Sequence, residues 1–137
     1  MNEQARPAEI LLVEDSPSDA ELTRAALQEG KLDNRLHHVK DGVEAIEFLR
    51  RQGAYASAPR PDMVLLDLNL PRLNGLEVLR QVRQIDKEVG VIMVTAVNEE
   101  QTGRQALELG AFDYIVKPLD LEYLERSLWY KVTTMML

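Results

Sequence analysis

Apolar residues gather in short runs along this chain, and longer amphipathic segments separate the runs. The runs are 10-ILLV-13, 63-MVLL-66, 91-VIMV-94 and 112-FDYIV-116, with a weaker one at 35-RLHHV-39. Three of them lack any alternation of apolar and polar residues, which is typical of strands covered on both faces in a parallel sheet. The pattern therefore predicts five strands, three of them fully buried.

The segments between the runs carry the signals of helix ends. A capping residue precedes each segment, and in most cases an acid or amide follows it three residues later: Ser16 with Asp19, Asp41 with Glu44, Asn74 with Glu77, Asn98 with Gln101, and Asp120. Gly30 and Gly110 close the first and fourth segments. Alternating strands and helices with short connections predict a (βα)5 chain, in which right-handed crossovers place helices on both faces of a parallel sheet.

The helices should bury their apolar positions against this sheet. The expected inner faces include Leu22, Ala25 and Ala26 in the first helix, Leu76, Leu79 and Val82 in the third, and Leu121, Leu124 and Leu128 in the fifth. The segment 53-GAYASAPRP-61 is rich in small residues and proline, which indicates a surface loop. We expect a single domain over residues 8–131, a flexible tail over 1–7, and the end of the last helix or a tail over 132–137.

Charge and composition narrow the function. The chain has 137 residues, with 16 basic against 23 acidic side chains and a net charge of −7. This balance argues against direct contact with nucleic acid, which requires a basic face, and against an anionic membrane surface. The longest apolar stretch, 89-VGVIMVTAV-97, is far shorter than the roughly 20 residues of a membrane-spanning helix. With no cysteine and no export signal, the expected location is cytoplasmic.

Residues with reactive or charged side chains follow the predicted strands. They are Glu14 and Asp15 after the first strand, Asp67 after the third, Thr95 at the end of the fourth, and Lys117 after the fifth. Because the carboxyl ends of parallel strands meet at one edge of a sheet, where open α/β sheets bind ligands, we expect these side chains to form one site.

Three carboxylates at one edge repel one another, and Lys117 can offset only part of that charge. A hard divalent cation such as Mg²⁺, which prefers carboxylate oxygens and water, can offset the rest. One oxygen of Asp67 is then left to act as a nucleophile, and carboxylates do form acyl phosphates. Mg²⁺, the Lys117 ammonium and the Thr95 hydroxyl would together neutralise the phosphoryl oxygens.

The motifs that contain these residues resemble the receiver domains of bacterial two-component response regulators. They are 12-LVEDSP-17, 64-VLLDLNLPRLNG-75, 94-VTA-96 and 114-YIVKP-118, in this order. The resemblance covers about residues 8 to 131 and implies a flavodoxin-like fold with strand order 2-1-3-4-5. It also implies a signalling protein, not an enzyme that turns over a separate substrate: a histidine kinase or a histidine phosphotransfer protein would transfer a phosphoryl group to Asp67.

The resemblance also implies roles for single residues. The implied Mg²⁺ ligands are Glu14 through water, Asp15, Asp67 and the backbone carbonyl of Asn69. The implied phosphoryl contacts are Thr95, the backbone of Ala96, and Lys117. Thr95 and Tyr114 would form the switch, with Tyr114 turning inward as Thr95 shifts, and a cis peptide would join Lys117 to Pro118. Phosphorylation would then change a surface that contacts a downstream protein or a second copy of the chain.

Two departures refine this expectation. Val97 stands two residues after Thr95, where some receivers that lose their phosphate quickly carry a polar residue, so we expect slow autodephosphorylation. Phe112 stands where the charged dimer network of the family usually has an acid, so a dimer through the last helix and strand should be more apolar. The long loop before the third strand resembles stand-alone receivers that partner phytochrome-type kinases.

Other interpretations fit the residues less well. A flavin or nucleotide module would need a phosphate-binding loop after the first strand, but the acids of 14-EDSPS-18 would repel a phosphate. An aspartyl phosphatase would need a second aspartate two residues after the nucleophile, but position 69 is asparagine. A degenerate receiver that acts only as an interaction domain would not need the complete set of phosphorylation residues. Tyr114 could also be a structural aromatic of its strand.

Overall fold

The structure is a computed structural model that describes residues 6–96, 100–117 and 120–135. The strands are β1 (Ala8–Val13), β2 (Asn34–Val39), β3 (Met63–Leu66), β4 (Gly90–Thr95) and β5 (Asp113–Val116). The helices are α1 (Pro17–Glu29), α2 (Gly42–Arg50), α3 (Gly75–Ile85), α4 (Glu100–Glu108) and α5 (Leu121–Met135), with a short 3-10 turn at Gly53–Tyr55. Strands and helices alternate, as the sequence pattern predicts.

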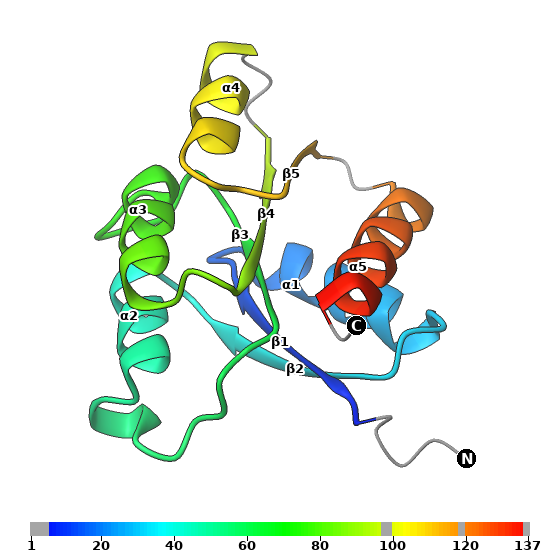
Figure 1. Cartoon of the computed structure of the whole chain (residues 1–137), viewed down its shortest axis with the longest axis horizontal. Helices are drawn as coiled ribbons and strands as arrows, with labels where there is room; N and C mark the ends of the chain where they lie inside the picture. Colours follow the sequence, from blue (N-terminus) through cyan, green and yellow to red (C-terminus); the bar gives the residue numbers. More distant parts are fainter. Residues whose placement is uncertain (1–5, 97–99, 118–119, 136–137) are drawn as a thin grey trace.

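The five strands form one sheet in the order β2-β1-β3-β4-β5, and each neighbouring pair is parallel. This confirms the predicted fold class and strand order. Helices α2 and α3 lie on one side of the sheet, and α1 and α5 lie on the other (Figure 1). The sheet is therefore covered on both faces, which explains why β3 and β4 consist almost entirely of apolar residues.

Each face of the sheet has its own hydrophobic core, because successive residues of a strand point to opposite faces. Leu11, Val64 and Val91 pack with Phe48 of α2 and Leu79 of α3. Their neighbours along the strands, which include Ile10, Met63, Leu65 and Ile92, form the second core with Ala20 and Leu27 of α1 and with Leu124 and Leu128 of α5.

The predicted helix starts are confirmed wherever the structure describes them. The side chains of four capping residues accept a hydrogen bond from a backbone N–H three residues later: Ser16, Asp41, Asn74 and Asp120. Asn98, the predicted cap of the fourth helix, lies outside the described residues.

The predicted inner face of α1 is wrong, and that of α5 is partly wrong. In α1 the buried residues are Ala20, Thr23 and Leu27, whereas Leu22 is 62% exposed, Ala25 is exposed and Ala26 is only partly buried. Thr23 can be buried because its hydroxyl donates a hydrogen bond to the carbonyl of Asp19 at 3.1 Å, so a polar residue takes an apolar position. In α5, Leu124 and Leu128 are buried as predicted, but Leu121 is exposed.

Among the described residues, none of the helices combines the length and the apolar character that crossing a bilayer requires. The loop between α2 and β3 is largely exposed, as predicted. It lies before the first residue of β3, at the edge of the sheet opposite to the residues that come after the strands.

An ion pair at that opposite edge joins the start of the chain to β3. Arg6 donates two hydrogen bonds of 2.8 Å to the carboxylate of Asp62, which also accepts one of 2.8 Å from the N–H of Glu9. Asp62 is 8% exposed. Burial opposes its ionisation, but the hydrogen bonds from Arg6 and Glu9 outweigh burial, so the pKa of Asp62 lies below its ordinary value.

This pair predicts a pH-dependent contribution to stability. Because the pKa of Asp62 is lower in the folded chain than in the unfolded chain, its contribution is complete above the unfolded pKa, about 4, and is lost as pH falls through the folded pKa. Urea unfolding at pH 7 should show Asp62→Asn to be less stable than the wild type by roughly 1–3 kcal/mol. The difference should shrink as the pH is lowered below 4; a difference of constant size would contradict the assignment.

Candidate functional site

The residues predicted for the site lie at one edge of the sheet. Glu14 and Asp15 follow the last residue of β1, Asp67 follows the last residue of β3, Thr95 ends β4, and Lys117 follows β5. The register aligns these ends: Val13 pairs with Leu66, and Thr95 pairs with Val116. A parallel sheet with these register positions therefore brings together residues that are up to 103 positions apart in the sequence.

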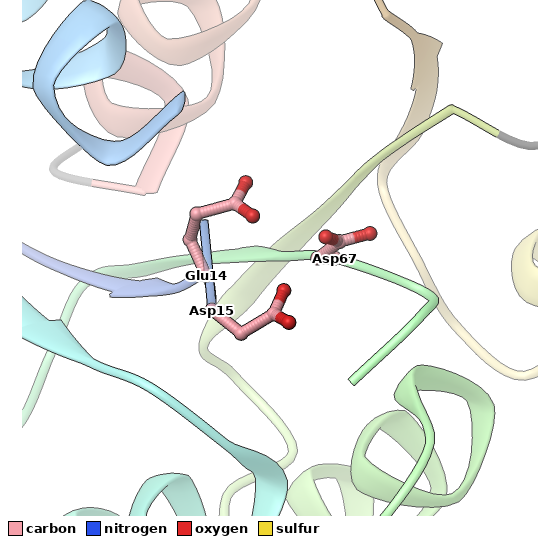
Figure 2. Close-up of side chains that lie close together, drawn as sticks. All are labelled: Glu14, Asp15 and Asp67. Atoms are coloured by element: carbon pink, nitrogen blue, oxygen red, sulfur yellow. The ribbon is translucent and has the colours of Figure 1, made fainter. Parts of the chain in front are cut away.

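The three acids form a compact cluster. One carboxylate oxygen from each of Glu14, Asp15 and Asp67 lies within 4.8 Å of the other two. The side chains of Glu14 and Asp15 diverge from neighbouring positions after β1, and both carboxylates turn toward Asp67 (Figure 2). Glu14 and Asp67 are 3% and 6% exposed, whereas Asp15 is exposed to solvent. The carboxylates of Glu14 and Asp67 are therefore held within the protein, and that of Asp15 faces solvent.

Burial has an electrostatic consequence for this cluster. It raises the pKa of Glu14, and the nearby charge of Asp67 raises it further, against the opposing effects of Lys117 and of the Ser16 N–H, which donates a 3.2 Å hydrogen bond to Glu14. The Asp67 carboxylate accepts a hydrogen bond of 3.2 Å from the N–H of Asn69. The local backbone after each strand therefore orients both buried carboxylates.

Lys117 is the cation of the site. Its Nζ lies 2.8 Å from Glu14 Oε1, 2.7 Å from Asp19 Oδ2 and 3.5 Å from Asp67 Oδ2. Burial opposes the charged form of Lys117, but these carboxylates outweigh burial and raise its pKa above the ordinary value. Lys117 is therefore a fixed positive charge at neutral pH.

Asp19 is a site residue that the sequence interpretation missed. The sequence places it in the first turn of α1, where an acid is explained by the helix dipole alone. The one sign in the sequence that Asp19 could reach the site was its position four residues after Asp15. Because α1 starts at the edge where β1 ends, an acid in its first turn lies near the same edge.

The remaining predicted residues fall at or beside this edge. Thr95 is fully buried, and Ala96 and Asn69 are exposed next to it and to Asp67. Tyr114 is partly buried in β5, and its ring lies against α4, where a Cβ added to Gly103 would meet it at 3.4 Å. Val97 and Pro118, on which the slow dephosphorylation and the cis peptide depend, lie outside the described residues.

The donor set fits a hard divalent cation. Carboxylate oxygens from three acids lie within 4.8 Å of one another, and one of these acids is open to solvent. Carboxylate oxygens are the ligands that Mg²⁺ takes together with water. The set contains neither the thiolates nor the cluster of imidazoles that softer metals prefer. A cation would also counter the two effects that raise the pKa of Glu14, which are its burial and, to a lesser extent, the charge of Asp67.

Comparison with known proteins places this geometry in a family. The sequence-family model of the response regulator receiver domain matches residues 10–128 of this chain. The response regulator Rcp1 of Synechocystis is 35% identical over an alignment of 144 positions, which covers 98% of each chain. The chain spans only about half the length of several other curated response regulators that it matches.

Several solved structures share the fold of this chain, and they include proteins with a bound metal ion and a phosphorylated protein. The Mn(2+)-bound form of Rcp1 matches with a TM-score of 0.78 and 37% identity over 88% of each chain. The phosphorylated cyanobacterial phytochrome response regulator RcpA matches with a TM-score of 0.78 and 34% identity, also over 88% of each chain. The receiver domain of the sensor histidine kinase PA1611 from Pseudomonas aeruginosa, with a magnesium ion in its active-site cleft, matches with a TM-score of 0.78 and 32% identity over 93% of this chain and 99% of that one. With its acidic cluster at the carboxyl edge of a 2-1-3-4-5 sheet, this chain belongs to the response regulator receiver family of two-component signalling.

Proposed function

We propose that this chain is a phosphoacceptor switch, which receives a phosphoryl group on Asp67 from a histidine kinase or a histidine phosphotransfer protein. The observation that carries the proposal is the arrangement around Asp67: a buried carboxylate at a strand end, two further acids within 4.8 Å, and the Lys117 ammonium at 3.5 Å. A buried carboxylate beside a fixed cation and a set of metal ligands is equipped to accept an anionic group and to stabilise its charge.

The chain's own residues would divide the work of phosphoryl transfer. An oxygen of Asp67 forms the bond to phosphorus while the bond from phosphorus to the imidazole nitrogen of the donor breaks. Lys117 and the hydroxyl of Thr95 would donate hydrogen bonds to the phosphoryl oxygens, and the N–H of Ala96 would add a third. Mg²⁺, held by Glu14 through water, Asp15, Asp67 and the carbonyl of Asn69, would supply the charge that lets the carboxylates and the phosphoryl group coexist.

Phosphorylation would be transmitted through the end of β4. Thr95 is fully buried next to the site, and Tyr114 lies on the neighbouring strand β5, beside α4. A shift of Thr95 toward the phosphoryl group would leave space that the Tyr114 ring can fill. The surface of α4, β5 and α5 is therefore the proposed output surface.

The proposed partners are a phytochrome-type or other histidine kinase upstream and a protein or a second copy of the chain downstream. The similarity to RcpA supports the first. On the output surface, the carboxylate of Asp113 accepts hydrogen bonds from Tyr123 and Ser127 within the same chain. Aromatic residues, Phe112 and Tyr130, stack beside it, which supports a contact that is more apolar than a network of charges.

Incubation with acetyl phosphate and Mg²⁺, followed by intact-mass measurement, tests the proposal. The wild type should gain the mass of one phosphoryl group, and the adduct should be lost in alkali, as an acyl phosphate is. Chelation of Mg²⁺ before the incubation should prevent the adduct. A chain that binds Mg²⁺ but forms no adduct would instead favour a receiver that acts only as an interaction domain.

Removal of Asp15 should specifically weaken the metal. Asp15 is exposed, so Asp15→Ala should leave the core intact while it removes one of the three clustered carboxylates. We expect Mg²⁺ affinity to fall by a factor of about ten or more, since hard cations depend on the number and charge of their oxygen ligands. Isothermal titration measures the affinity, with Asp33→Ala, an exposed acid before β2, as a control for net charge. Near-normal affinity in Asp15→Ala would refute its role as a ligand.

A further inference from the structure

The shortest contact of the Lys117 ammonium is with an acid that does not belong to the cluster of Glu14, Asp15 and Asp67. Lys117 Nζ lies 2.7 Å from Asp19, closer than the 2.8 Å to Glu14 and the 3.5 Å to Asp67. Asp19 belongs to α1, and the two residues are 98 positions apart in the sequence. This contact links the first helix directly to the end of β5.

An ammonium group has three N–H donors, and two of those of Lys117 are engaged by Glu14 and Asp19. The distance to Asp67 exceeds that of a good hydrogen bond. In the proposed function, Lys117 must turn its third N–H toward a phosphoryl group on Asp67, so its contacts with Glu14 and Asp19 limit how far the ammonium can move. Glu14 belongs to the cluster of three acids that would hold the metal, whereas Asp19 does not. Asp19 is thus a competitor that metal binding would leave in place.

Asp19 is also unable to follow Lys117 freely. Its N–H donates to the Ser16 side chain that caps α1, and its carbonyl accepts from the Thr23 hydroxyl. Its backbone is therefore fixed in the first turn of the helix. The carboxylate can therefore hold Lys117 only from the side of α1.

From this geometry we propose that Asp19 is a positioning residue that restrains Lys117 in the unphosphorylated chain and so limits how strongly the site binds a phosphoryl group. The inference rests on the proposed function of Asp67 and Lys117. Neutralising Asp19 should weaken its hold on the Lys117 ammonium, because an amide oxygen attracts an ammonium less than a carboxylate does, and should remove a negative charge beside the incoming anion. Both effects favour the phosphoryl-bound state.

Binding of beryllofluoride, a phosphoryl analogue, at saturating Mg²⁺ measures this effect. Asp19→Asn should bind it roughly two- to five-fold more tightly than the wild type, in line with the modest value of a partly exposed ion pair. Asp19→Glu, which keeps the charge, should return the affinity toward that of the wild type. Glu21→Gln is the matched control: it removes the same charge from the same helix at a side chain that is 77% exposed. Glu21→Gln should leave the affinity for beryllofluoride unchanged.

The Lys117→Ala background separates restraint of Lys117 from a general effect of charge. In that background, Asp19→Asn should no longer tighten beryllofluoride binding. Tightening of equal size with and without Lys117, or unchanged or weaker binding in Asp19→Asn itself, would overturn the inference while the proposed function stands. A wild type that binds no beryllofluoride at all would overturn both.

A measurement without metal or phosphate tests the resting contact itself. In spectra of ¹⁵N-labelled lysine ammonium groups, the Lys117 signal can be assigned by its loss in Lys117→Ala. That signal should shift in Asp19→Asn and stay in place in Glu21→Gln. A signal that is identical in the wild type and Asp19→Asn would show that Asp19 does not hold Lys117.

Discussion

Asp67→Asn should abolish the phosphoryl adduct completely in the acetyl phosphate experiment. An amide has neither the charge nor the nucleophilic oxygen of a carboxylate, so no acyl phosphate can form. The variant should fold normally, because asparagine has the same shape and removes one of three mutually repelling carboxylates. Intact-mass measurement detects the loss, and urea unfolding confirms that the variant is folded.

The chain offers a matched control for this substitution at the other end of the same strand. Asp62 precedes β3 and is 8% exposed, while Asp67 follows β3 and is 6% exposed. Asp62→Asn makes the same chemical change in a similarly buried carboxylate and should still form the adduct. An adduct of normal yield in Asp67→Asn would mean that another residue accepts the phosphoryl group.

Gly75→Ala should unfold or severely destabilise the chain. A Cβ at Gly75 would lie 2.4 Å from the carbonyl oxygen of Asp67 and 2.7 Å from the Cα of Leu68. Both are backbone atoms, so no side chain can turn aside to make room. Overpacking of this kind costs about 1–3 kcal/mol or more, and here the strain acts directly on the segment that carries Asp67. We expect a loss in urea unfolding at the upper end of that range and a reduced yield of the phosphoryl adduct.

Gly103→Ala is the control that should move stability in the opposite direction. Gly103 lies inside α4, where a Cβ would meet the Tyr114 ring at 3.4 Å, an ordinary contact. Alanine in a helix interior is favoured over glycine by about 0.5–1 kcal/mol. If Gly75→Ala and Gly103→Ala had similar stabilities, the close approach between α3 and the end of β3 would not be the reason for glycine at position 75.

The parts of the fold that depend on local patterns could be predicted from the sequence. Apolar runs without polar alternation specify buried parallel strands, and the residues directly after these strands must lie at the same edge of the sheet. For this reason Glu14, Asp15, Asp67, Thr95 and Lys117 could be assigned to one site from their order in the chain. The caps at Ser16, Asp41, Asn74 and Asp120 are equally local, since each contact spans three residues.

The parts that the sequence did not reveal depend on contacts between distant residues or on side chains with two possible environments. Asp19 has a sufficient local explanation in its helix, and only the position of α1 beside Lys117 gives it a second partner. Thr23 is buried because a hydrogen bond within α1 satisfies its hydroxyl, so periodicity alone assigns the inner face to Leu22. The pairing of Arg6 with Asp62 spans 56 positions and leaves no signal in either neighbourhood.

The exposed loop between α2 and β3 offers a practical route to monitoring the proposed switch. It lies at the edge of the sheet opposite Asp67, and Ala56 and Ser57 within it are exposed. The chain contains no cysteine, so a single cysteine at either position would be a unique attachment point for a fluorescent dye. A dye there would sit away from the acids, the lysine and the proposed output surface, and could report assembly with a kinase or a second copy without occupying either the site or that surface.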